Sequence, residues 1–203
     1  MSFFALLDLL QNGPPSPWRA GVLPRKEFCE RVTKIHNINR FRHGSYALRL
    51  NEELTNIAQQ WAETLTYQKE LSHHNFKFRG MRIGQNITMK WAPNRATYDP
   101  QELCEQWYRE YLSFDFGVEP TDLKAGHFTQ MVWKNSTEIG VGRAQAKDGR
   151  SIVVVNYYPP GNVIGEFNAN VQPVSSALSS INVRAAGSIG SNLKSPSRLK
   201  VKN

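Results

Sequence analysis

The chain has 203 residues, of which 40% are hydrophobic and 21% are charged, the composition of an ordinary globular protein. This length accommodates one domain with a full core plus appendages. The formal net charge is +8, yet the sequence contains no nucleic-acid-binding motif, so we exclude nucleic acid as a partner. The excess positive charge has two possible explanations. Either the protein binds an anionic membrane or an acidic polymer, or the basic tail is solvated and has no partner.

The first 24 residues predict an irregular extension. Met1–Leu10 is apolar, but it lacks a basic n-region, contains Asp8 and is followed by a proline-rich segment over 13–17. We therefore do not expect a secretory signal peptide. No stretch of the chain approaches eighteen uninterrupted apolar residues, so the sequence predicts no membrane-spanning helix.

Two helices are expected next. Arg25–Arg42 carries Phe28, Val32 and Ile35 at helical spacing, has basic residues at its end, and is followed by Gly44 as a stop signal. In the second helix Asn51 is the expected cap, and the first turn is acidic. Its apolar stripe consists of Leu54, Ile57, Ala58, Trp61 and Leu65.

The middle of the chain predicts loops and a third helix. Leu71–Asn86 is interpreted as a loop-like segment, and Trp91–Asp99 as an irregular connection. Asp99 and Glu102 have the spacing of a capping box, with Pro100 at the first helical position. The buried stripe of this helix is expected to hold Leu103, Trp107 and Tyr111.

The segment Lys124–Gly142 combines a histidine, aromatic residues and two glycines. Phe128, Met131 and Val132 fall at helical spacing, which predicts a short helix. Strands follow at Glu138–Ala146 and Ser151–Tyr158, joined by a hairpin turn at 147–150, and the apolar run Ile152–Val155 indicates a central strand. Helices around an antiparallel hairpin give an α+β sandwich.

The two cysteines and the C-terminus suggest a location. Cys29 and Cys104 lie on apolar helical faces without metal-ligand spacing, so we expect buried free thiols. The absence of a disulfide framework favours a reducing compartment. Residues 174–203 are serine-rich and basic and predict a disordered tail.

Two stretches of the chain resemble a known family. Gly126–Trp133, GHFTQMVW, looks like the first signature of the CAP (SCP/TAPS) superfamily, and Val155–Val163, VNYYPPGNV, looks like its second. The resemblance covers about 25–173 and is closest to the Golgi-associated plant pathogenesis-related branch. It implies a CAP domain over these residues, folded as a three-layer α-β-α sandwich with a central antiparallel sheet.

The resemblance also implies a cleft with two histidines and two acids, which can hold a divalent metal, often zinc. His127 lies in the first signature, and Glu110 ends a run like the family motif W-Y-x-E. The second histidine is His74 by its separation of eleven residues from Gln85, or His73 by its L-x-H context. Gln85 stands where the family motif G-E-N has its glutamate, and an amide carries no charge. We therefore expect a weak, pH-dependent Zn²⁺ site at most.

The implied function is non-enzymatic binding of sterol, fatty acid or phospholipid at a membrane surface, with a homodimer as a further expectation. The alternative is a metal-dependent hydrolase with His127 as base and Glu110 as its orienter, although no G-x-S-x-G motif supplies a nucleophile. The expected location is intracellular, either soluble or peripheral to a membrane. The alternative is extracellular, as for most of the family.

Overall fold

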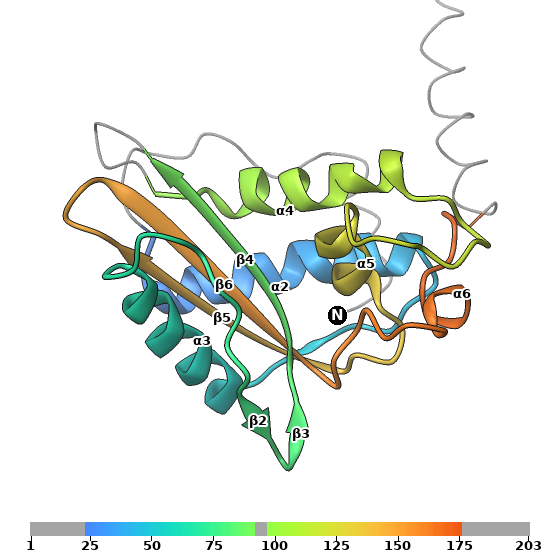
Figure 1. The fold of residues 1–203 in the computed structure, drawn as a ribbon, viewed down its shortest axis with the longest axis horizontal. Coiled ribbons are helices and arrows are strands. Elements are labelled where there is room, and N and C mark those ends of the chain that lie inside the picture. Colours follow the sequence, from blue (N-terminus) through green and yellow to red (C-terminus); the bar gives the residue numbers. More distant parts are fainter. Residues whose placement is uncertain (1–22, 92–96, 176–203) are drawn as a thin grey trace, which may run out of the picture.

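The computed structural model describes residues 23–91 and 97–175 (Figure 1). The extension predicted over 1–24 and the tail predicted over 174–203 fall almost entirely outside the described residues. The elements in chain order are α2 (Arg25–Arg42), β1 (Arg49–Leu50), α3 (Glu52–Leu65), β2 (Lys77–Phe78), β3 (Met81–Arg82), β4 (Gly84–Trp91), α4 (Pro100–Tyr108), the 3-10 helix η1 (Arg109–Ser113), α5 (Gly126–Val132), β5 (Glu138–Gln145), β6 (Arg150–Tyr158) and α6 (Phe167–Asn170).

A four-stranded sheet in the order β1-β5-β6-β4 forms the middle layer. The three long strands are antiparallel, since β6 pairs antiparallel with β5 on one side and with β4 on the other. The two-residue strand β1 pairs with β5 in parallel, so the sheet predicted as antiparallel has a short parallel edge. A separate two-stranded sheet consists of β2 and β3.

Helices cover both faces of the sheet (Figure 1). Ile152 and Val154 of β6 pack with α3 on one face, whereas Val153 and Val155 pack with α2, α4 and α5 on the other. All four side chains are fully buried. The three-layer α-β-α sandwich and the buried central strand are therefore confirmed.

The predicted caps begin two of the helices. The Asn51 side chain accepts a hydrogen bond from the backbone N of Leu54 at 3.0 Å, and Asp99 accepts one from the backbone N of Gln101 at 2.7 Å. The capping box at α4 is incomplete, because Glu102 accepts a hydrogen bond from Lys90 at 2.7 Å instead of reaching back to the cap. Of the helices in the described ranges, none is long and apolar enough to cross a bilayer.

Two predictions from local pattern were wrong. The third helix was expected to bury Tyr111, but α4 ends at Tyr108 and Tyr111 lies in η1 with 36% of its surface exposed. The segment predicted as a loop over 71–86 contains β2, β3 and the start of β4. Its turn is Arg79–Gly80, where both residues have positive φ, of 50° and 79°. Such a turn joins two strands without a longer loop.

Glycines on β5 let α3 pack directly against the sheet. Gly140 and Gly142 are two residues apart on β5, so both lie on the face of the strand toward α3. A Cβ atom at Gly142 would lie 2.3 Å from backbone atoms of Ala58 and Gln59 in α3. Because the obstacle is backbone, no side-chain rotation relieves it. The short distance between helix and strand therefore depends on these two residues.

Substitution Gly142→Ala is expected to lower the free energy of unfolding by about 2 kcal/mol through overpacking. Urea unfolding would measure the change. Gly126→Ala is the matched control, because Gly126 is helical and its added Cβ would meet the Cβ of the exposed Leu123 at 3.3 Å rather than backbone. Equal stability of the two variants would contradict the close approach of α3 to β5.

Candidate functional site

Glu110 caps the N-terminus of α5 from the neighbouring element η1. Its Oε2 atom accepts hydrogen bonds from the backbone N of His127 at 2.9 Å and of Phe128 at 3.2 Å. The local cap position, Ala125, offers no side-chain acceptor. The carboxylate thus satisfies two of the free N–H groups of the first turn and places negative charge at the positive end of the helix.

The His127 ring is held on both of its nitrogens. Nδ1 lies 2.7 Å from Oε1 of Glu110, and Nε2 lies 3.2 Å from the carbonyl oxygen of Ile87 on β4. Both partners are acceptors, so a neutral ring would direct a lone pair at one of them. The Trp107 indole stacks on the imidazole with centroids 5.5 Å apart and planes 6° apart. The ring is partly exposed, at 37% of its side chain, but its orientation is fixed.

Gln85 lies on the face of the sheet that α3 covers, opposite to the face that α5 and His127 cover. Its Nε2 donates to Oδ1 of Asn156, its partner on β6, at 2.9 Å, and Asn156 in turn donates to the carbonyl of Leu54 in α3. Its Oε1 accepts from the backbone N of His74 at 3.2 Å and lies 3.3 Å from Nδ1 of His73. Gln85 therefore ties the segment before β2 to the face covered by α3.

The His74 ring packs among aromatic side chains. It stacks on Phe76 with centroids 3.7 Å apart and meets Trp61 edge-on at 4.5 Å. Its Nδ1 atom is buried and has no hydrogen-bond partner. The alternative histidine, His73, is exposed and contacts Gln85 through its ring. Of the two, His74 is partly buried among aromatic rings, whereas the ring of His73 faces the amide of Gln85.

The structure brings the four predicted residues together as two pairs. Glu110 contacts His127, and Gln85 contacts the segment with both histidine candidates, but no hydrogen bond or ion pair among the described residues joins one pair directly to the other. Nor do the described residues contain a group of three His, Cys, Asp or Glu side chains that could hold a metal. Since Nε2 of His127 already faces the Ile87 carbonyl, this arrangement does not fit a zinc ion bound by His74 and His127.

A buried polar chain that the sequence did not predict links α2 to this region. Nδ1 of His36 donates to the Val32 carbonyl at 2.8 Å, which leaves Nε2 to accept from the Tyr157 hydroxyl at 2.8 Å. Asn86 donates to that hydroxyl at 3.2 Å and to the His127 carbonyl at 3.0 Å. His36, Asn86 and Tyr157 are at most 2% exposed. The sequence signal for a buried His36 was its spacing from Val32, which places both residues on the same face of α2.

His36 also lies 3.5 Å from Sγ of Cys104, the expected buried thiol. Burial raises the pKa of this thiol. Because Nδ1 of His36 donates its hydrogen to Val32, it cannot take up the thiol proton. The pair is therefore not an activated nucleophile.

The comparisons with known proteins agree with this fold. A sequence model of the family described as "CAP: Cysteine-rich secretory protein family" matches residues 33–157. The chain is 40% identical over 157 residues to Golgi-associated plant pathogenesis-related protein 1 of Homo sapiens, across 75% of this chain and 97% of the human protein. The chain belongs to the CAP family.

Other CAP relatives are more distant. Pathogenesis-related protein 1C of Nicotiana tabacum is 32% identical, with 64% of this chain and 74% of that protein covered. The solved structure of Schistosoma mansoni venom allergen-like protein 4 matches with a TM-score of 0.57 at 20% identity, covering 75% of this chain and 98% of that one. The structure of NaASP2 with Zn²⁺ matches with a TM-score of 0.52 at 19% identity, covering 79% and 91%. At these identities the solved structures support the fold alone.

The two CAP signatures pack against each other. Gln130, in the first, is 1% exposed and accepts from the backbone N of Gly161, in the second, at 2.8 Å. A Cβ atom at Gly161 would lie 2.7 Å from both Gln130 and Trp133. Thr129 donates to the Asn162 side chain at 2.6 Å. Much of the family pattern in this chain is therefore architectural.

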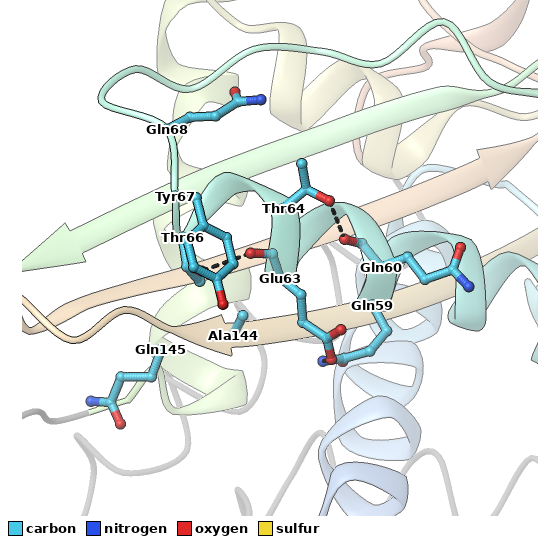
Figure 2. Close-up of a pocket in the computed structure, with 9 residues that line it drawn as sticks. All are labelled: Gln59, Gln60, Glu63, Thr64, Thr66, Tyr67, Gln68, Ala144 and Gln145. Carbon is cyan, nitrogen blue, oxygen red and sulfur yellow. Dashed lines mark hydrogen bonds between the residues drawn. The ribbon is translucent and has the colours of Figure 1, made fainter.

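An open groove lies elsewhere on the CAP domain, at the end of α3. It has a volume of about 850 Å³, and Figure 2 shows the side chains around it. Most are amides and hydroxyls; the lining consists of Gln59, Gln60, Glu63, Thr64, Thr66, Tyr67, Gln68, Ala144 and Gln145. Gln59 covers β5 by bonding to both the N and O of Arg143. None of the predicted site residues lines this groove.

The cap made by Glu110 yields a testable expectation. Substitution Glu110→Gln removes one acceptor oxygen, so either a backbone N–H of α5 or Nδ1 of His127 loses its partner. We expect the free energy of unfolding to fall by about 1–3 kcal/mol. Chemical denaturation would measure this, with Glu105→Gln on the exposed side of α4 as the control. Unchanged stability would show that the carboxylate does not cap α5.

Proposed function

We propose that this chain is a non-catalytic CAP domain that binds lipid at an anionic membrane surface. The observation that carries the proposal is the placement of His127, whose two ring nitrogens both face acceptor oxygens of the protein, on Glu110 and Ile87. The other polar residues of the family motifs are likewise used internally, Glu110 as a helix cap and Gln85 as a tie between segments. Such a site holds the fold together and leaves binding to other surfaces.

The hydrolase alternative receives less support. A general base needs a free lone pair directed at a proton, but Nε2 of His127 faces the Ile87 carbonyl. The amide of Gln85 cannot replace the charge or the proton transfer of the glutamate in the family motif. Cys104 is buried beside a histidine that cannot deprotonate it. These three arrangements favour binding over catalysis.

Zinc provides a direct test. The structure of NaASP2 with Zn²⁺ has a similar fold, whereas both ring nitrogens of His127 in this chain face acceptor oxygens of the protein. We expect protein purified without chelating resin to contain zinc well below one ion per chain. If a weak site does form, Gln85→Glu should strengthen it, because a second carboxylate offsets the charge of the metal. Stoichiometric zinc that disappears in His127→Ala would contradict the proposed role of His127.

The proposal of membrane binding is supported by the positive charge of the chain and by its membership of the CAP family. The net charge of +8 includes five basic residues and no acid between Pro173 and Asn203, and polybasic segments are attracted to anionic lipid surfaces. We expect the protein to sediment with vesicles of phosphatidylcholine plus phosphatidylserine and to stay in solution with phosphatidylcholine alone. Deleting 174–203 should weaken the binding. Equal retention by both vesicle types, unaffected by the deletion, would count against the proposal.

A further inference from the structure

The β2–β3 hairpin projects beyond the sandwich, at the bottom of Figure 1. Its two-residue turn, Arg79–Gly80, has positive φ at both positions, as in a type I′ turn. Phe78 is 2% exposed and fixes the hairpin to the domain by packing with Leu54 and Tyr158. The hairpin is therefore short, defined in shape and attached on one face.

Two unpaired cations lie side by side on its other face. Lys77 and Arg82 are partners in register, and side chains alternate along a strand, so both point away from the face that contains Phe78. Both are exposed, and within the described part of the chain neither has a hydrogen-bond or ion-pair partner. Like charges directly opposite each other destabilise a strand pair. The repulsion between Lys77 and Arg82 therefore destabilises the hairpin, and an anionic partner would remove this repulsion.

The nearby acid does not neutralise them. Glu138 is 8% exposed at its side chain and already pairs with Arg79 at 2.7 Å and with Arg49 at 3.2 Å. The acids in the first turn of α3, Glu52 and Glu53, form no ion pair with the hairpin among the residues described. This corner of the domain thus keeps a surplus of positive charge.

We propose that the outer face of the β2–β3 hairpin is the surface through which the protein docks on the phosphate groups of an anionic bilayer. Opposite side chains start about 5 Å apart, so Lys77 and Arg82 can reach one phosphate together. Arginine binds phosphate through two parallel hydrogen bonds, and lysine adds a compact charge. This inference rests on the proposed function and specifies its surface.

The experiment compares full-length variants in sedimentation with vesicles of phosphatidylcholine plus phosphatidylserine. The test variant is Lys77→Ser with Arg82→Ser. The control is Lys26→Ser with Lys34→Ser, which removes the same charge from exposed positions on α2. Each cation at an anionic surface contributes about fivefold to binding, so the hairpin variant should bind roughly 30-fold more weakly than wild type. The control should lose less than about threefold, because its charges lie on another element.

The outcomes separate the two proposals. Wild-type protein that ignores anionic vesicles would overturn the proposed function and the hairpin surface together. Wild-type binding that survives in the hairpin variant, or that falls equally in the control, would overturn only the hairpin surface. Both substitutions replace exposed residues, so thermal unfolding should show that the two variants are folded like wild type.

Discussion

Replacing Arg40 with methionine is expected to lower the free energy of unfolding by at least about 3 kcal/mol. The side chain is fully buried, and its guanidinium donates to four backbone carbonyls, those of Tyr46, Met131, Trp133 and Ser136, at 2.7–3.1 Å. Three of these bonds tie the end of α2 to the end of α5 and to the segment that follows it. Methionine fills much of the space but donates nothing, so buried carbonyls would lose their partners.

Burial also lowers the pKa of Arg40 to about 10, which reflects the cost of removing a cation from water. The four carbonyl contacts offset that cost, since charge-assisted hydrogen bonds are stronger than neutral ones. Lys34→Met is the matched control, because Lys34 is an exposed cation on the same helix. Urea unfolding should place the control within about 0.5 kcal/mol of wild type. A similar small effect for Arg40→Met would show that the four contacts contribute little to stability.

The same helix shows what the sequence could predict and what it could not. Phe28 and Val32 are fully buried as expected from their spacing, and the predicted bounds of α2 match those observed. Arg40 was expected only as one of the basic residues at the end of the helix, because a helical pattern does not distinguish a solvated arginine from a buried one. Three of its four carbonyl partners lie more than 90 residues away in the chain. Only tertiary packing brings these acceptors together.

The candidate site shows the same division. The motifs assigned His127 and Glu110 to one metal cleft, and these two side chains do contact each other, but the motifs did not predict that the carboxylate caps α5. Strand alternation explains why Gln85 and Asn86 act on opposite faces of the sheet. That alternation could not be used, because the segment over 71–86 was interpreted as a loop. The error in one strand therefore carried over to the geometry of the site.

Stability should fall as the pH is lowered from 6.5 toward 4, because of His36. Burial lowers the pKa of this imidazole from 6.5 to about 4, against a smaller opposite effect of the Val32 carbonyl. Well above pH 6.5 the ring is neutral in both folded and unfolded chains and contributes no pH dependence. Between these values the unfolded chain binds a proton that the folded chain does not, so the free energy of unfolding falls by roughly 3 kcal/mol in total. His43, whose pKa burial also lowers, adds in the same direction.

Substitution His36→Gln tests this assignment. Glutamine can still accept from the Tyr157 hydroxyl but does not titrate, so the variant should be less stable at neutral pH and lose less stability toward about pH 5. His73→Gln is the control, since His73 is exposed and its removal should leave the wild-type slope intact. Urea unfolding at several pH values between 7.5 and 5 covers the window before most carboxylates titrate. If His36→Gln keeps the full wild-type slope, another group carries the pH dependence, and the neutral, buried His36–Tyr157 hydrogen bond is not its source.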